Sequence, residues 1–269
     1  MNLLEIIDNL NLEKIDQEQF LKPALRRGLF KKASDFSLKA ALTSLPFALV
    51  ALPQIVKAST DDATTDVLNF ALTLEYLEAK FYDMGLKSTK LNITDNAVIS
   101  QIYKHEAAHV ALLKSVLKAD AVAEPVFDFE TAYPDVFSNY QTFLTVAQAL
   151  EDTGVRAYKG QAGVLKETAT LTVALQIHSV EARHAAEIRK LRGAKGWISL
   201  KSDNTSENNA APAAVYAGEE TVTQSDIDLS TLGLKVGTTA ITRAQIAEAF
   251  DEILTKDQVL AIAGPFIKK

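Results

Sequence analysis

The 269-residue sequence contains no cysteine. This absence excludes disulfides, thiolate nucleophiles, iron–sulfur clusters and cysteine-based zinc sites together. Histidine is also scarce, with four residues in the whole chain. Any metal must therefore be bound by carboxylates and a few imidazoles, a ligand set that suits iron, manganese or zinc.

Excess positive charge and long apolar runs are missing as well. The net charge is −6 and the bulk of the chain has no basic stripe, which argues against nucleic-acid binding. The apolar stretch from Phe36 to Leu52 contains Lys39 and Pro46, and it is too short and interrupted for a stable membrane span. What is present, 48% hydrophobic and 23% charged residues, is typical of a folded chain with a buried core.

Residues 1–58 have the features of a leader segment. Arg26-Arg27 precedes the apolar stretch, and Val56-Lys57-Ala58 follows it as a small-x-Ala cleavage site. This order resembles a twin-arginine export signal, which implies an exported, periplasmic protein whose mature chain begins after Ala58. The alternative is a helix that lies on the main domain of a cytoplasmic protein.

Four long segments with helical apolar spacing follow the leader. They run from about Thr64 to Leu86, Asp95 to Lys118, Asp135 to Gln161, and Thr170 to Arg192. Gly85 and Gly193 are expected to end the first and last of them. The connection between the second and third, through Glu124 to Pro134, is longer than a helical hairpin needs. We predict an all-α fold, with a four-helix bundle over residues 60–196.

Two of these segments carry the same pair of potential metal ligands, Glu106/His109 and Glu181/His184. Residues three apart in a helix lie on one face, roughly 5–6 Å apart at Cβ, so both members of a pair can reach one metal ion. A single pair is weak evidence, because Glu- and Ala-rich helices produce it by accident. Two pairs in a chain with four histidines predict a metal site.

The other two segments repeat a second motif. Leu74-Glu75 is followed seven residues later by Tyr82, and Leu150-Glu151 by Tyr158. The two halves of the bundle are therefore expected to be related by a pseudo-two-fold axis. The repeat favours Glu75 over Glu78, which has no counterpart, and we expect Glu75 and Glu151 to bridge the two Glu-x-x-His pairs.

The predicted site thus contains four carboxylates, whose charge of about −4 would be costly to bury without two divalent cations. Its predicted metal ligands are Glu75, Glu106, His109, Glu151, Glu181 and His184. Side chains that contact these ligands are expected among Glu78, Tyr82, Tyr158 and His178. The alternatives are a core position with a satisfied hydroxyl for the two tyrosines, a solvated face for Glu78 and a simply polar side chain for His178. His105 is expected to point about 100° away from Glu106 and to be structural.

The assignment of these six ligands rests on a resemblance as well as on spacing, because ferritin-like di-iron and di-manganese bundles use one Glu from each of two helices and Glu-x-x-His from the other two. Asn69–Tyr82 (NFALTLEYLEAKFY) and Ala149–Gly160 (ALEDTGVRAYKG) are similar to the first and third helices of the bacterial ferritin-like proteins related to plant desiccation-associated proteins. Ala249–Leu260 (AFDEILTKDQVL) is similar to their C-terminal region. The resemblance implies a bundle that binds two metal ions, with iron first and manganese second, and it leaves the reaction open.

Residues 197–269 have a different character. A polar stretch, Ser202 to Pro212, is followed by two capping boxes, Thr242–Gln245 and Thr255–Gln258, each before a short apolar pattern. We predict a loop and two short helices packed on the bundle, because this segment has too few apolar residues for a core of its own.

Two functions are compatible with these features. The first is a ferroxidase or another oxidoreductase that reduces dioxygen or peroxide at two metal ions in stress protection. The second is a stress-associated protein that holds metal without turnover or serves a structural role. The long segments on both sides of the bundle argue against a ferritin-type cage, so we expect a monomer or small oligomer.

Overall fold

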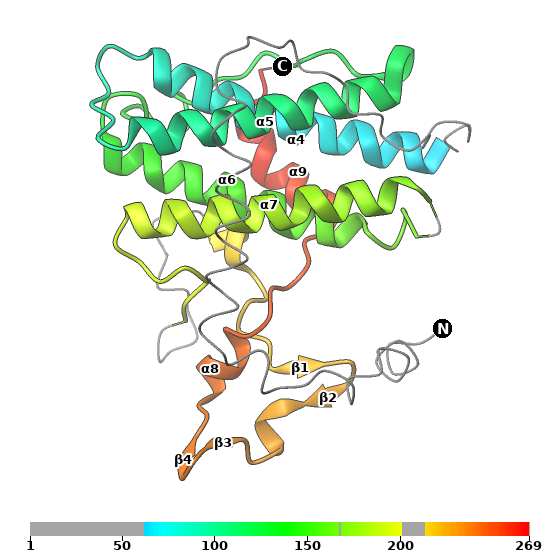
Figure 1. Cartoon of the computed structure of the whole chain (residues 1–269), viewed down its shortest axis with the longest axis vertical. Helices are drawn as coiled ribbons and strands as arrows, with labels where there is room; N and C mark the ends of the chain where they lie inside the picture. The colour runs from blue at the N-terminus through cyan, green and yellow to red at the C-terminus, as the bar shows by residue number, and fades with distance from the viewer. Residues whose placement is uncertain (1–61, 167, 201–212, 269) are drawn as a thin grey trace, which may run out of the picture. The chain divides into compact units, whose positions relative to one another are not determined.

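Four long helices lie side by side in the computed structural model, which describes residues 62–166, 168–200 and 213–268 (Figure 1). α4 packs against α5, α6 packs against α7, and α4 also contacts α6. This arrangement confirms the predicted all-α class and the four-helix bundle. The helices are α4 (Asp62–Lys87), α5 (Asn96–Leu117), α6 (Tyr140–Gln161) and α7 (Thr170–Leu191).

The start of α6 differs most from the prediction. The helix was expected to begin near Asp135, but it begins at Tyr140. Asn139 ends a preceding turn, in which its backbone N–H donates to the Asp135 carbonyl at 2.8 Å. The Asn139 side chain accepts hydrogen bonds from the N–H groups of Gln141 and Thr142, so it caps the helix.

Two glycines that were expected to end helices behave differently. Gly193 follows α7 with φ +71°, the left-handed conformation that commonly terminates a helix. Gly85 does not end α4, which continues to Lys87. A Cβ on Gly85 would lie 2.3 Å from the ring of Phe143, so this glycine allows α6 to pack closely on α4.

The core is aromatic where the C-terminal end of α4 packs against the N-terminal end of α6. Phe81 of α4 stacks on Phe143 of α6, with ring centroids 4.8 Å apart and planes 10° from parallel. Phe129 and Phe137, from the long connection between α5 and α6, also contact the ring of Phe81. The connection therefore contributes to the core, and its length is explained by the apolar area that it buries.

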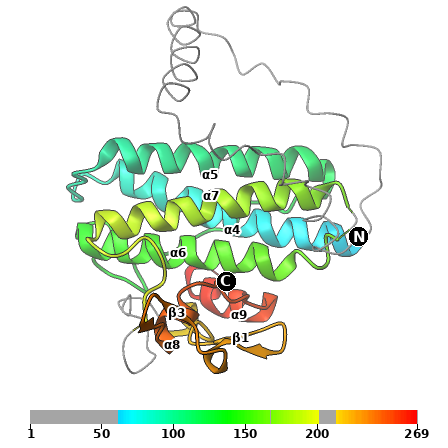
Figure 2. The same ribbon diagram turned by 60° about the horizontal axis from the view of Figure 1, so that its bottom comes forward.

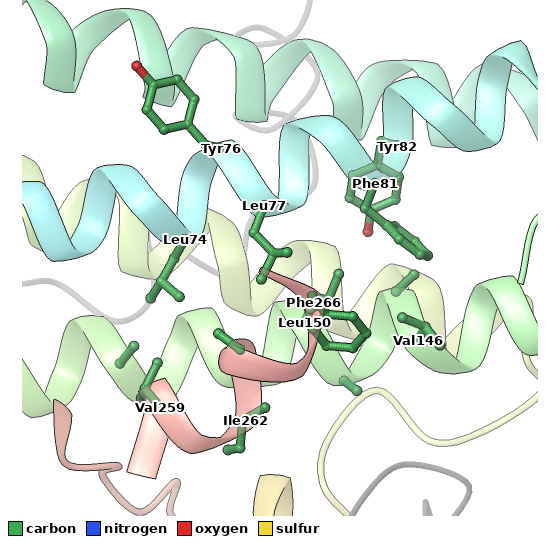
Figure 3. Packing of buried hydrophobic residues seen from close by; sticks show 14 of the residues in the cluster. Leu74, Tyr76, Leu77, Phe81, Tyr82, Val146, Leu150, Val259, Ile262 and Phe266 are labelled. Carbon is green, nitrogen blue, oxygen red and sulfur yellow. The ribbon is translucent and has the colours of Figure 1, made fainter. Parts of the chain in front are cut away.

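The C-terminal segment packs against the bundle through α9 (Lys256–Ala263), which contacts α6 (Figure 2). Figure 3 shows Val259, Ile262 and Phe266 among the buried residues of the core, with Phe266 drawn beside Leu150 of α6. The chain end also pairs with the α5–α6 connection, because Phe127 and Ile267 form a β-bridge. Both predicted capping boxes are present, one before α8 (Arg243–Ala247) and one before α9.

Several short elements of the described residues were not predicted. The C-terminal segment contains two antiparallel hairpins and three 3₁₀ turns, and a further 3₁₀ turn follows α5. The hairpins are β1 (Thr223–Gln224) with β2 (Ile227–Asp228), and β3 (Lys235–Val236) with β4 (Thr239–Ala240). The 3₁₀ turns are η2 (Lys118–Asp120), η3 (Ala213–Tyr216), η4 (Leu229–Thr231) and η5 (Gly264–Phe266).

The predicted export segment, residues 1–58, and the polar stretch 202–212 lie outside the described residues. Within the described part of the chain, no helix has both the length and the apolar character that crossing a membrane requires.

Candidate metal centre

All six predicted ligands meet inside the bundle, where each of the four helices contributes a carboxylate. They form two groups whose potential ligand atoms lie within 4.8 Å of one another. Glu106 and Glu181 belong to both groups. The first group is Glu75, Glu106, His109 and Glu181, and the second is Glu106, Glu151, Glu181 and His184.

The cluster is buried because each ligand occupies the apolar face of its helix. The four glutamates are 0% exposed, and His184 is 4% exposed. On α7, for example, the apolar residues Ile177, Ala185 and Ile188 are buried together with Glu181 and His184. A carboxylate at such a position takes the place of a core residue, and it must be compensated there.

His109 lies against three carboxylates. Its Nδ1 is 3.1 Å from Glu75 Oε2, 3.2 Å from Glu106 Oε2 and 3.1 Å from Glu181 Oε1. An imidazole nitrogen carries at most one proton and can satisfy only one of these oxygens well.

His184 has the equivalent position in the other half. Its Nδ1 is 2.8 Å from Glu106 Oε1, 3.2 Å from Glu151 Oε2 and 3.6 Å from Glu181 Oε2. Both rings therefore direct Nδ1 into the cluster, as the pseudo-two-fold repeat predicts.

The cluster has more acceptors than donors. Glu106 Oε1 and both carboxylate oxygens of Glu181 are buried without a hydrogen bond of acceptable geometry, although each lies near an imidazole nitrogen. Buried polar atoms in folded proteins are almost always paired, so three such oxygens in one place need a cationic partner.

Burial raises the pKa of three carboxyl groups in and beside the cluster, those of Glu75, Glu78 and Glu151. It raises the pKa of Glu75 and of Glu78 well above the usual value, and the nearby charge of Glu181 adds to this effect. Burial also raises the pKa of Glu151 to about 7, although His184 opposes the shift. Without metal, these three carboxyl groups therefore hold a proton more tightly than exposed ones do.

The imidazoles respond to the same charges. Burial lowers the pKa of His109, but the adjacent carboxylates of Glu106, Glu181 and Glu75 outweigh this effect and raise the pKa to about 12. The pKa of His184 is raised in the same way, against burial, by the charge of Glu151 and by the adjacent carboxylates of Glu106 and Glu181. Both shifts show that the cluster attracts positive charge, which either protons or metal cations can supply.

The distances also fit metal coordination. Nitrogen and oxygen ligands bind iron-sized divalent cations at about 2.1 Å, so neighbouring ligands in an octahedral arrangement are separated by about 3.0 Å. Five of the six separations from Nδ1 to carboxylate oxygen are between 2.8 and 3.2 Å. The residues present therefore fit a pair of metal ions.

Two tyrosines donate hydrogen bonds to the cluster glutamates of α4 and α6. The Tyr82 hydroxyl of α4 donates to Glu151 Oε1 of α6 at 2.5 Å, and the Tyr158 hydroxyl of α6 donates to Glu75 Oε1 of α4. Each of these carboxylates thus has one oxygen bound by tyrosine and one that faces an imidazole. Tyr82 and Tyr158 therefore contact predicted ligands.

Glu78 and His178 occupy different environments. Glu78 is 3% exposed, and its Oε1 lies 3.1 Å from the position of a Cβ on Gly154, which would also lie 3.7 Å from Glu181 Oε2. Gly154 thereby leaves room for both carboxylates. His178 hydrogen-bonds through Nδ1 to the backbone carbonyl of Val155 at 2.9 Å and makes no hydrogen bond to the six described cluster residues.

His105 was expected to point away from Glu106 and to be structural, and the structure adds that it contacts a predicted ligand, His184. Its Nδ1 lies 2.9 Å from Nε2 of His184. The 100° rotation that turns His105 away from Glu106 on α5 directs it across the gap to α7. Its position directly before a Glu-x-x-His pair was the available signal, but the helical repeat alone does not say which neighbour lies there.

A four-helix bundle that buries four carboxylates and two imidazoles at its centre has the architecture of carboxylate-based metal proteins. Comparison with protein families agrees with this class. Residues 63–194 match the model of the ferritin-like domain family, so the chain contains a ferritin-like domain. A comparison with curated proteins found no match.

Proposed function

We propose that the central cluster binds two metal ions and that the protein is an oxidoreductase of the ferroxidase or dioxygen- and peroxide-reducing type. The observation that carries the proposal is the presence of two four-residue ligand groups that share two carboxylates. One metal position is formed around His109 and the other around His184.

The contacts favour Glu106 and Glu181 as the shared ligands, in place of the predicted Glu75 and Glu151. Glu106 and Glu181 each direct one oxygen toward His109 and the other toward His184. Glu75 and Glu151 each accept a tyrosine hydrogen bond at one oxygen and direct the other toward a single imidazole. We therefore assign them as ligands of a single metal each.

We propose iron as the metal, with manganese as the second candidate. Carboxylate oxygens and imidazole nitrogens without thiolates suit both metals. Bound ferrous ions would supply the electrons for reduction of dioxygen or peroxide.

The surrounding protein limits which oxidants can react. The four glutamates are 0% exposed, so a bulky organic substrate has no direct contact with them in this conformation. Dioxygen and peroxide are small enough to enter a packed bundle through its fluctuations. Tyr82 and Tyr158 keep Glu151 and Glu75 oriented, which preserves the ligand geometry during a change of metal charge.

The proposal is tested by metal content and ferrous oxidation. The full chain is freed of metal, loaded with Fe(II) without oxygen, and analysed for bound iron before exposure to dioxygen or peroxide. We expect two iron ions per chain and oxidation faster than that of free Fe(II). Glu181→Gln, which removes a shared carboxylate, should lower both values, because it affects both metal positions.

Glu187→Gln is the matched control, since Glu187 lies on the same helix and its side chain is 38% exposed in a pair with Lys190. It should behave as the wild type. Bound iron without accelerated oxidation would overturn the enzyme proposal and leave a non-catalytic metal-binding protein. Absence of stoichiometric metal would overturn both.

We also propose that the chain is exported, is related to the desiccation-associated proteins, and forms a monomer or small oligomer. The twin-arginine-like segment supports export, and Arg26→Lys with Arg27→Lys should retain the protein in the cytoplasm, as cell fractionation would show. Light scattering on the chain after residue 58 tests the assembly, and a cage-sized mass would contradict it.

A further inference from the structure

The two proposed metal positions differ in the contacts that their histidines make on the side of the ring away from the cluster. Behind His184, the ring of His105 lies almost parallel, with centroids 5.1 Å apart and planes 10° apart. His105 Nδ1 is 2.9 Å from His184 Nε2, and the Gln101 side chain lies 2.8 Å from His105 Nε2. A hydrogen-bonded chain of three side chains therefore runs from the surface of α5 to this position.

The other position has no such chain. The offset of 75 residues that relates Glu106 to Glu181 also relates His105 to Val180, which has no hydrogen-bonding side chain. Among the described residues, no side chain hydrogen-bonds to Nε2 of His109, and its contacts with the carboxylates are all made by Nδ1. The pseudo-two-fold symmetry is therefore broken behind the imidazoles and nowhere among the six predicted ligands.

This difference affects which imidazole nitrogen carries the proton. His184 directs Nδ1 into the cluster, so a metal there requires that Nδ1 be free and Nε2 carry the proton. The proton on Nε2 then needs an acceptor, which His105 Nδ1 provides. A hydrogen bond of this kind orients a ligand imidazole and strengthens its metal binding.

The hydrogen bond between His105 and Gln101 is compatible with this protonation of His184. When His105 accepts at Nδ1, it carries its own proton on Nε2 and donates it toward Gln101. A glutamine amide presents an oxygen or an NH₂ group by rotation, so Gln101 can accept this proton in the loaded protein and donate to His105 in the metal-free one.

We propose that His105, supported by Gln101, is a positioning residue that keeps Nδ1 of His184 free for metal and makes this position bind metal more tightly than the position at His109. This inference rests on the proposed di-metal function. It predicts sequential loading, with the His184 position filled first.

The location of His105 makes the inference testable without unfolding the bundle. His105 and Gln101 line an open groove of about 520 Å³ between α5 and α7, together with Ile102 and Arg183. His105 is only partly buried, so its replacement leaves the main core intact.

The experiment titrates Mn(II) into the metal-free full chain and measures the binding constants by calorimetry. Three variants are compared with the wild type. His105→Asn places an amide oxygen near the position of the imidazole Nδ1, whereas His105→Leu has the same branching without an acceptor. Val180→His supplies the missing counterpart on α7. All three are checked for folding by circular dichroism.

We expect two binding constants for the wild type. His105→Leu should weaken the tighter one by about 10- to 100-fold and leave the weaker one unchanged, and His105→Asn should restore most of the loss. Val180→His should tighten the weaker site. In ¹⁵N spectra of the wild type loaded with Zn(II), a diamagnetic ion that the same ligand set accepts, the His184 ring should carry its proton on Nε2.

Equal loss in the Asn and Leu variants, or no loss in either, would overturn the inference. Two equal binding constants in the wild type would also overturn it while leaving the proposed di-metal function intact. No Mn(II) or Fe(II) binding by the wild type would instead contradict the proposed function itself.

Discussion

At the scale of single residues, buried charges hold the parts of this protein together. Arg156 of α6 is fully buried, and its guanidinium donates to the backbone carbonyls of Val215, Ala217 and Glu252. It also lies 3.0 Å from Glu219 Oε1. Because one guanidinium has five donors in a fixed plane, it satisfies several carbonyls of the C-terminal segment at once.

Glu219 makes the stability of this contact between α6 and the C-terminal segment depend on pH. Burial raises its pKa to about 7, although Arg156 and the Glu252 N–H oppose the shift and Asp251 and Glu252 add to it. The folded state therefore binds the proton more tightly than the unfolded chain does. The resulting stabilisation is fully present below pH of about 4.5 and is lost as the pH rises through about 7.

We predict that the unfolding free energy of the wild type, relative to that of Glu219→Gln, falls by on the order of 3 kcal/mol between pH 4.5 and 7.5. Urea unfolding of both proteins across this range measures the difference. Other titrating groups cancel in the comparison, because both proteins contain them. A difference that rises with pH would show that the Arg156 ion pair dominates over burial.

At the scale of elements, a glycine in α6 determines how the C-terminal segment docks. A Cβ on Gly160 would lie 2.1 Å from the backbone carbonyl oxygen of Leu254. The Leu254 N–H donates to the Arg156 carbonyl in the same contact. The segment before α9 therefore crosses α6 where the helix lacks a side chain.

Gly160→Ala should destabilise the protein by about 1–3 kcal/mol, because a backbone carbonyl cannot move aside as a side chain can. Gly163→Ala is the control, since no atom lies within 4 Å of a Cβ at that position and its φ is not in the left-handed region. Thermal unfolding of both variants, with limited proteolysis of the C-terminal segment, tests the contact. Equal stability of the two variants would contradict it.

Elements were predictable to the extent that they repeat a pattern over several turns. The four long helices have apolar residues at helical spacing over more than 20 residues, and their expected ends mostly agree with the structure. The two hairpins have strands of two residues, too short for an alternating pattern. Their turns require positive φ at Ser225, Asp226 and Gly237, and neighbouring residues give little sign of this requirement.

At the scale of the whole molecule, metal binding and folding are expected to be linked. The metal-free cluster contains four buried glutamates and three oxygens without a hydrogen bond. Metal that binds only the folded state stabilises it, by about 2.7 kcal/mol at a free concentration 100 times the Kd. Metal loading therefore tests the site independently of any reaction.

We predict that Mn(II) raises the melting temperature of the wild type and that a chelator reverses the increase, as differential scanning calorimetry would show. Glu181→Gln should lose most of this increase, and Glu187→Gln should retain it. If Glu181→Gln gained as much as the wild type, the stabilising metal would be bound elsewhere.

The sequence by itself determined the bundle and the six residues at its centre. Helical spacing places each Glu-x-x-His pair on one face, and the repeat of Glu75/Tyr82 in Glu151/Tyr158 requires no knowledge of packing. Such patterns are local, so they are visible before the chain folds.

Only the tertiary structure decided how these residues divide their contacts. Tyr82 and Tyr158 each bind the glutamate of the other helix, which leaves Glu106 and Glu181 as the carboxylates that face both histidines. The contact of His105 with His184 likewise depends on how closely α5 and α7 approach. Spacing along one helix states which face a side chain occupies, but the neighbour on that face is set by the packing of the other helices.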